Sequence, residues 1–100
     1  MNEKEVRTLI RERIRTGQLP SGPADKTFGG RASNTACDCC GSQITWHEVE
    51  YELHFRSYSD AFRMHLDCNR IWWEEWTAEE RRKEYEPRLV TRDIAPGPSA

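Results

Sequence analysis

The spacing of apolar positions predicts a helix over residues 3–16. Apolar side chains recur there at intervals of three and four residues, which places them on one side of a helix: Val6, Leu9, Ile10 and Ile14. Asn2 followed by Glu5 is typical of a capping box, and Gly17 supplies a C-terminal stop. The first helix, within residues 1–17, is therefore expected to be amphipathic, with an apolar side that needs cover.

Residues 18–36 show no such period. They are rich in Gly, Pro, Ser and Asn, which predicts a flexible linker rather than a helix or a strand. A connection of this length is unusual inside a compact domain. We therefore expect the first helix to be loosely tethered to the rest of the chain.

Apolar and polar residues alternate between Ile44 and Arg56, which predicts a half-buried strand. The buried face would hold His47, Val49, Tyr51, Leu53 and Phe55. The outer, acidic face would hold Trp46, Glu48, Glu50, Glu52, His54 and Arg56. Residues 57–60 suit a turn, and residues 61–64 would return as a short antiparallel strand. The pattern therefore predicts a β-hairpin, in which His47 is expected to be a core histidine rather than a ligand or a base.

A second helix is expected to begin near His65 and to run past Trp76. Thr77 with Glu80 forms another capping-box pattern, so the helix could break or kink there. Pro87 is expected to end it. Residues 87–100 close in Gly, Pro and Ser and are expected to be a disordered tail, which leaves 37–86 as the main folded domain.

The composition indicates that the fold needs an additional cross-link, either a disulfide or a bound metal. Of 100 residues, 36% are hydrophobic and 32% charged, which is lean for a small packed core. The start of the chain lacks the apolar segment of a secretory signal, and no stretch approaches about 18 apolar residues. We therefore expect a cytoplasmic protein without a membrane segment. In that compartment, clustered cysteines are typically metal ligands or redox groups rather than disulfides.

Four residues have the spacing of a metal site: Cys37, Cys40, His65 and Cys68. A two-residue gap lets both thiolates of a tight turn face one ion, and Gly41 eases that turn. His65 and Cys68 are three residues apart, so one turn of helix places them on the same face. The pattern predicts one structural Zn²⁺ per chain; an Fe–S or other metal centre, or no metal, are the alternatives.

The motif "CDCCG", a hairpin and a helix beginning with "HLDC" together resemble a treble-clef zinc finger, over about residues 37–76. The paired Cys-x2-Cys and His-x2-Cys motifs are also similar to the first zinc module of LIM domains. The resemblance implies an α+β fold: a small zinc-stapled domain made of a zinc knuckle, a β-hairpin and a C-terminal helix. The zinc-binding domain is predicted to span residues 37–86, with the N-terminal amphipathic helix separate from it. The sequence leaves open whether the apolar side of that helix is covered by this domain, by a second copy of the chain or by a partner.

Cys39 and the four tryptophans have two interpretations each. Cys39 could be a redox-sensitive thiol beside the metal, but we expect a spare small side chain on the knuckle. Trp72 and Trp76 follow Cys68 at four-residue steps and are expected to seal the metal site. Trp46 and Trp73 are candidates for an exposed contact patch.

Charge and ligand type limit the possible functions. The net charge is -2; residues 1–36 carry seven Lys/Arg against four Asp/Glu, and the remainder carries eight against thirteen. One side of the first helix is basic and could touch phosphates, or could simply be solvated: Lys4, Arg7, Arg11 and Arg15. A closed four-ligand site has no position for an activated water, so we expect no enzyme and no small-molecule substrate.

We therefore expect a non-catalytic zinc-binding module that acts in protein–protein interaction or regulation. The alternative is a small nucleic-acid-binding zinc-finger regulator that uses its basic N-terminal helix. The sequence leaves the oligomeric state open.

Overall fold

The structure, a computed structural model, describes residues 2–94, with side chains described through Glu84. It contains two helices and three strands, in the order α1 (Glu3–Arg15), β1 (Lys26–Arg31), β2 (Val49–His54), β3 (Phe62–His65) and α2 (Leu66–Ile94). The strands form one antiparallel sheet in the order β1-β2-β3. The protein is therefore small and α+β, as predicted.

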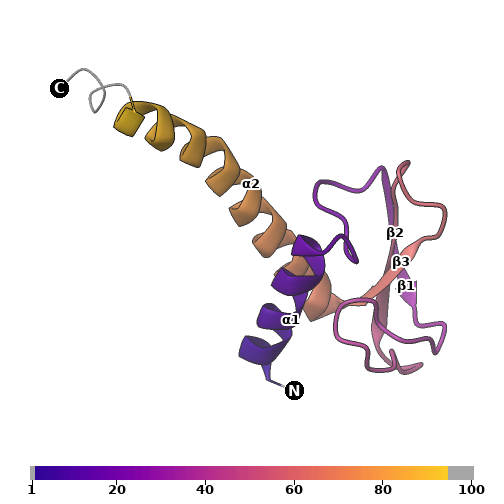
Figure 1. The fold of residues 1–100 in the computed structure, drawn as a ribbon. Coiled ribbons are helices and arrows are strands. Elements are labelled where there is room, and N and C mark those ends of the chain that lie inside the picture. Colours follow the sequence, from indigo (N-terminus) through magenta and orange to yellow (C-terminus); the bar gives the residue numbers. More distant parts are fainter. Residues whose placement is uncertain (1, 95–100) are drawn as a thin grey trace.

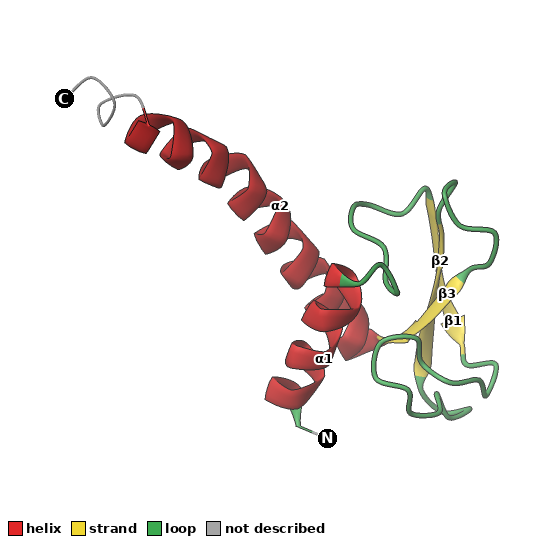
Figure 2. Cartoon of the chain, viewed as in Figure 1, coloured by secondary structure: helices red, strands yellow, loops and turns green. Residues whose placement is uncertain are grey.

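The sheet and α1 both lie against the beginning of α2, and the remainder of α2 projects away from them (Figure 1). Figure 2 shows that long loops surround the sheet. Neither helix, over the described residues, combines the length and the apolar character that crossing a membrane requires.

α1 has the predicted start. The Asn2 side chain accepts a hydrogen bond from the Glu5 backbone N–H at 2.9 Å, and the Glu5 carboxylate accepts one from the Asn2 N–H at 3.4 Å. The helix ends at Arg15, and Gly17 follows with a φ of +83°, a left-handed conformation that glycine adopts without strain. The capping box is therefore confirmed.

α1 is docked on α2, so the prediction of a separate N-terminal helix is wrong. Ile10 of the apolar stripe is fully buried. Beside it, the Arg7 guanidinium donates to Glu74 and to Glu75, both at 2.7 Å, and Arg11 Nε donates to Glu75 at 2.8 Å. The apolar side of α1 is therefore covered by the same chain, and ion pairs hold α1 against α2.

The predicted linker, residues 18–36, contains strand β1, so that prediction is wrong over Lys26–Arg31. All six residues pair with β2. Two adjacent glycines hide the strand signal in the sequence. One of them, Gly29, is covered by the Tyr51 ring, whose Cε1 would lie 3.2 Å from an added Cβ. An aromatic ring from the neighbouring strand thus supplies the packing that the glycine lacks.

The predicted strand over residues 44–56 is shortened at its start. Residues 45–48 form a turn, in which the Glu48 carboxylate accepts from the Thr45 N–H at 2.9 Å and from the Thr45 hydroxyl at 2.7 Å. His47 is exposed in this turn, so the prediction of a core histidine is wrong. β3 returns beside β2 within one residue of the predicted bounds.

The two faces of β2 follow the predicted alternation with two exceptions. Leu53 is buried in the core, as is Phe55 just after the strand. Val49, however, is 47% exposed. Glu50, predicted to face solvent, is buried because the segment after β1 covers it; its carboxylate accepts from the Ser33 N–H at 3.0 Å and from the Ser33 hydroxyl at 2.8 Å.

α2 begins at Leu66, after His65 has ended β3, and continues to Ile94. The Thr77 hydroxyl donates to the Trp73 carbonyl at 2.8 Å, so it bonds back to its own helix instead of capping a new one. The helix also continues past Pro87, so the predicted break and the predicted stop are both wrong. Residues 95–100 of the predicted disordered tail lie outside the described residues.

The core lies where the sheet, α1 and the first turns of α2 meet. Trp72 is at its centre; its ring meets Phe55 edge to face at 6.0 Å, and its Nε1 donates to the Pro20 carbonyl at 2.8 Å. The remaining buried apolar side chains come from α1, the loops, β2, β3 and the start of α2: Ile10, Leu19, Cys37, Cys39, Ile44, Leu53, Met64, Cys68, Ile71 and Trp76.

Candidate metal centre

The first pair of candidate ligands lies on a tight turn. Ala36 and Gln43 pair across its base, and the Gly41 N–H donates to the Cys37 carbonyl at 2.8 Å. Gly41 has a φ of +83°, which the reversal of the chain requires. The Cys39 N–H points at the Cys37 sulfur at 3.4 Å. The turn therefore holds Cys37 and Cys40 close together.

The second pair lies where the sheet meets α2. His65 is the last residue of β3, and Cys68 is in the first turn of α2. His65 Nδ1 is 3.5 Å from the Cys40 sulfur and 3.8 Å from the Cys68 sulfur. The donor atoms of the four predicted ligands lie within 4.8 Å of one another: Cys37, Cys40, His65 and Cys68.

These distances fit one tetrahedral ion. With Zn–S bonds of about 2.3 Å and Zn–N bonds of about 2.0–2.1 Å, the nitrogen–sulfur edge of the tetrahedron is about 3.6 Å. The two measured edges from His65, 3.5 and 3.8 Å, lie on either side of that value. The four residues are therefore positioned to hold a single metal ion, and three thiols with one imidazole are consistent with zinc.

The outer nitrogen of His65 has its own partners. Nε2 lies 3.3 Å from the Gln43 carbonyl oxygen and 3.7 Å from a Glu48 carboxylate oxygen. A histidine that binds metal through one nitrogen usually donates the other N–H to such an acceptor, which fixes the ring and its tautomer. No sequence pattern indicates this role for Gln43, because it acts through its backbone carbonyl. Glu48 was predicted to belong to the acidic outer face.

A second set of contacts holds in place the tight turn that carries Cys37 and Cys40, which we call the knuckle. Asp38 exchanges two hydrogen bonds with Arg63 of β3: its carboxylate accepts from the Arg63 N–H at 2.7 Å, and its own N–H donates to the Arg63 carbonyl at 2.8 Å. Arg13 of α1 donates to the Asp38 carbonyl at 2.7 Å. The knuckle is therefore tied both to the strand that carries His65 and to the first helix.

Cys39 differs from its neighbours. It is fully buried, and its sulfur lies 3.9 Å from the Cys68 carbonyl oxygen. Thiol hydrogen bonds with Cys37 and Cys68, together with burial, raise the pKa of Cys39 well above its ordinary value. The corresponding bonds from Cys39 and Cys68 lower the pKa of Cys37. A buried, protonated thiol is a poor nucleophile, which agrees with the expectation of a spare small side chain.

The tryptophans divide as predicted between core and surface. Trp72 and Trp76 are buried, whereas Trp46 is 73% exposed and Trp73 is 48% exposed. Leu66, one heptad before Trp73 and so on the same side of α2, is 52% exposed. We call Leu66 and Trp73 the Trp73 surface. At its start lies a hollow of about 230 Å³, lined by Glu48, Val49, His65, Leu66 and Asp67.

Comparisons of the chain with protein families, curated proteins and solved structures found no match. The role of the protein must therefore be inferred from the metal centre and the surfaces around it.

Proposed function

We propose that this protein is a non-catalytic, zinc-stapled binding module of the treble-clef type, and that its partner is another protein. The observation that carries the proposal is the convergence of Cys37, Cys40, His65 and Cys68 on one ion-sized space. The ligands come from a knuckle, the end of a hairpin strand and the first turn of a helix. That order of elements supports the treble-clef interpretation.

The donor set supports a structural role for the metal. Three thiolates and an imidazole fill the four positions of a tetrahedral zinc, whereas catalytic zinc keeps one position for water or substrate. The ligand pairs are also far apart in the sequence, so binding one ion closes the chain between Cys40 and His65. Metal binding would then contribute directly to the free energy of folding.

A protein partner is supported by the Trp73 surface. Two large apolar side chains, Leu66 and Trp73, are about half exposed on one side of α2. Tryptophan is enriched among the residues that dominate binding energy in protein interfaces. The surface lies on a helix whose first turn holds a metal ligand, so the staple would also fix the orientation of this surface.

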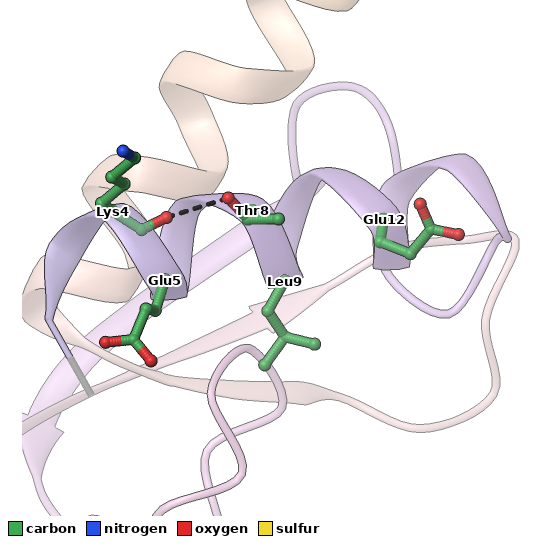
Figure 3. Close-up of a pocket in the computed structure, with 5 residues that line it drawn as sticks. All are labelled: Lys4, Glu5, Thr8, Leu9 and Glu12. Atoms are coloured by element: carbon green, nitrogen blue, oxygen red, sulfur yellow. Dashed lines mark hydrogen bonds between the residues drawn. The ribbon is translucent and has the colours of Figure 1, made fainter.

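A nucleic-acid partner is less well supported, because the basic side of α1 is largely neutralised. Arg7 pairs with Glu74 and Glu75, and Arg11 pairs with Glu75. Arg15 pairs with Glu12, so Lys4 is the member of this basic side without an ion pair among the described residues. Figure 3 shows Lys4 with the residues that line a groove along α1. The groove is lined by Lys4, Glu5, Thr8, Leu9 and Glu12. Binding to phosphates requires cations that are free to replace counterions.

The zinc staple can be tested by native mass spectrometry of freshly purified protein, before and after a chelator, with circular dichroism alongside. We expect one zinc per chain, and we expect the chelator to remove both the zinc and ordered structure. A protein without metal, or a fold that survives metal removal unchanged, would contradict the proposal.

The class of partner can be tested by fluorescence anisotropy with labelled single-stranded and duplex DNA and RNA at low salt. We expect little binding to any of them, because the finger is acidic and three arginines of α1 are paired with carboxylates: Arg7, Arg11 and Arg15. Tight binding that weakens steeply as salt is added would instead favour the nucleic-acid alternative.

A further inference from the structure

Strand β1 leaves one edge of the sheet open. It is at the end of the strand order and pairs with β2 alone. All six of its residues are exposed. Within the described part of the chain, Lys26–Arg31 make no backbone hydrogen bond outside the sheet. Every second residue of an edge strand directs its N–H and C=O away from the sheet, so β1 presents unpaired backbone groups to solvent.

The middle of this edge is accessible and lacks charge. Phe28 is 54% exposed, with its ring edge against His54 at 5.6 Å. Gly30 has open space where a side chain would be, because no heavy atom lies within 4 Å of an added Cβ. That face of the sheet is therefore uncovered at Gly30. Because all six residues of β1 are exposed, a second strand could approach the edge, and Phe28 would offer it an apolar contact.

The charges at the two ends of β1 are uncompensated. Among the described residues, neither Lys26 nor Arg31 has a carboxylate within ion-pair distance, whereas Arg63 in β3 pairs with Glu50 and Glu52. Two cations five residues apart therefore flank a neutral, open strand edge. An added strand with an acidic residue near each end would match this edge in both hydrogen bonding and charge.

We propose that the open edge of β1 binds an extended acidic segment of another protein as a fourth strand of the sheet. A second copy of this chain fits less well. Lys26–Arg31 contains two cations and no carboxylate, so a paired copy of β1 would add like charges to this edge and its strand would offer neither cation an acidic partner. The inference goes beyond the proposed function, because it involves neither the metal ligands nor the Trp73 surface.

The test uses the metal-loaded full chain and two fluorescein-labelled peptides, Glu-Val-Thr-Val-Thr-Glu and its charge-reversed form Lys-Val-Thr-Val-Thr-Lys. Anisotropy titrations to millimolar peptide measure affinity, and amide hydrogen exchange locates the contact. We expect the acidic peptide to bind about five- to tenfold more tightly than the basic one, as two exposed ion pairs allow. We also expect slower amide exchange within residues 26–31.

A charge-reversal variant makes the test specific. Lys26→Glu combined with Arg31→Glu should reverse the preference, so that the basic peptide binds more tightly. Lys4→Glu combined with Lys83→Glu changes the net charge equally but lies on the helices, and it should leave the preference unchanged. Equal metal content and circular dichroism in all variants exclude misfolding as the cause.

Several results would overturn the proposal. These are failure of the acidic peptide to bind at millimolar concentration, a peptide preference that survives the reversal of Lys26 and Arg31, and protection outside residues 26–31. A dimer in native mass spectrometry that the Lys26→Glu/Arg31→Glu variant abolishes would assign the edge to a second copy instead. None of these results bears on the zinc content, so this proposal and the zinc staple can fail independently.

Discussion

At the residue scale, Cys39 and Cys40 are neighbours in the sequence but have different roles in the structure. The Cys40 sulfur lies 3.5 Å from His65 Nδ1, within the ligand group, whereas the Cys39 sulfur is packed in the core beside the Cys68 carbonyl. Cys40→Ser should therefore lose the metal and unfold residues 37–76. Cys39→Ser should keep one metal per chain and cost about 1 kcal/mol, because its hydroxyl is buried but has an acceptor nearby.

Native mass spectrometry and denaturant unfolding of the two variants check this prediction. A folded, metal-loaded Cys40→Ser protein would show that the ligand assignment is wrong. Loss of metal from Cys39→Ser would show instead that Cys39 belongs to the site.

The grouping of the four candidate ligands was predictable from the sequence because metal chemistry restricts both residue type and spacing. The contacts that support it were not. The two hydrogen bonds between Asp38 and Arg63 join residues that are 25 positions apart, and three of the four groups that take part are backbone groups. The Gln43 carbonyl beside His65 is likewise a backbone group, and every residue has one. Their roles depend on where the chain places them, which spacing does not encode.

At the scale of the elements, the strongly periodic segments were predictable and the others were not. The helical period of α1 and the alternation in β2 each reflect a buried side, and both were predicted apart from their ends. β1 was missed because a strand that exposes both faces has no alternation of buried and exposed residues. α2 runs past Pro87, although proline interrupts the hydrogen bonds of a helix interior.

The two glycines of β1 give a matched pair of substitutions. Neither is among the glycines with positive φ, so alanine fits the backbone at both positions. Gly30→Ala meets no atom within 4 Å and should stabilise the fold by about 0.5–1 kcal/mol through lower entropy of the unfolded chain. Gly29→Ala should gain less or lose stability, because its Cβ would press on the Tyr51 ring at 3.2 Å. Urea unfolding of the metal-loaded proteins measures the difference, and equal stability would contradict the described covering of Gly29.

The docking of α1 on α2 should weaken in acid. Burial tends to raise the pKa of Glu75, but hydrogen bonds from Arg11 and Arg7 outweigh it and hold the pKa below the ordinary 4.5. A carboxyl whose pKa is lowered by folding stabilises the fold above its unfolded pKa, and this contribution is lost as the pH falls through the folded pKa. The ion pairs should therefore hold α1 at neutral pH and release it below about pH 4.5.

Glu75→Gln separates this effect from the acid release of metal, which protonation of the thiolates also causes. The variant should already show faster amide exchange in α1 at neutral pH, a loss of about 1 kcal/mol after allowing for solvent screening. Glu12→Gln is the matched control, because Glu12 pairs with Arg15 within α1 and both side chains are exposed. Exchange in α1 that is the same in both variants would show that apolar packing alone holds the helix.

At the scale of the whole molecule, the core occupies one end of an elongated shape. The principal extents are 64 × 30 × 17 Å. Every buried side chain that the structure describes comes at or before Trp76, while α2 continues to Ile94 and projects from the body (Figure 1). The folding unit and the projecting part of α2 are therefore separable within the described residues.

Two truncations test that separation. A chain that ends at Glu84 keeps the whole described core and the four ligands, so its free energy of unfolding should change by less than about 1 kcal/mol, or roughly 8 °C in Tm. A chain that ends at Glu75 loses Trp76, which packs beside Trp72 with ring centroids 6.1 Å apart. Removing a buried tryptophan costs about 3–5 kcal/mol, a large share of the stability of a small domain. Thermal unfolding with metal bound should therefore give the chain that ends at Glu75 a clearly lower Tm than the chain that ends at Glu84. Strong destabilisation of the chain that ends at Glu84 would show instead that residues after Glu84 contribute to the core.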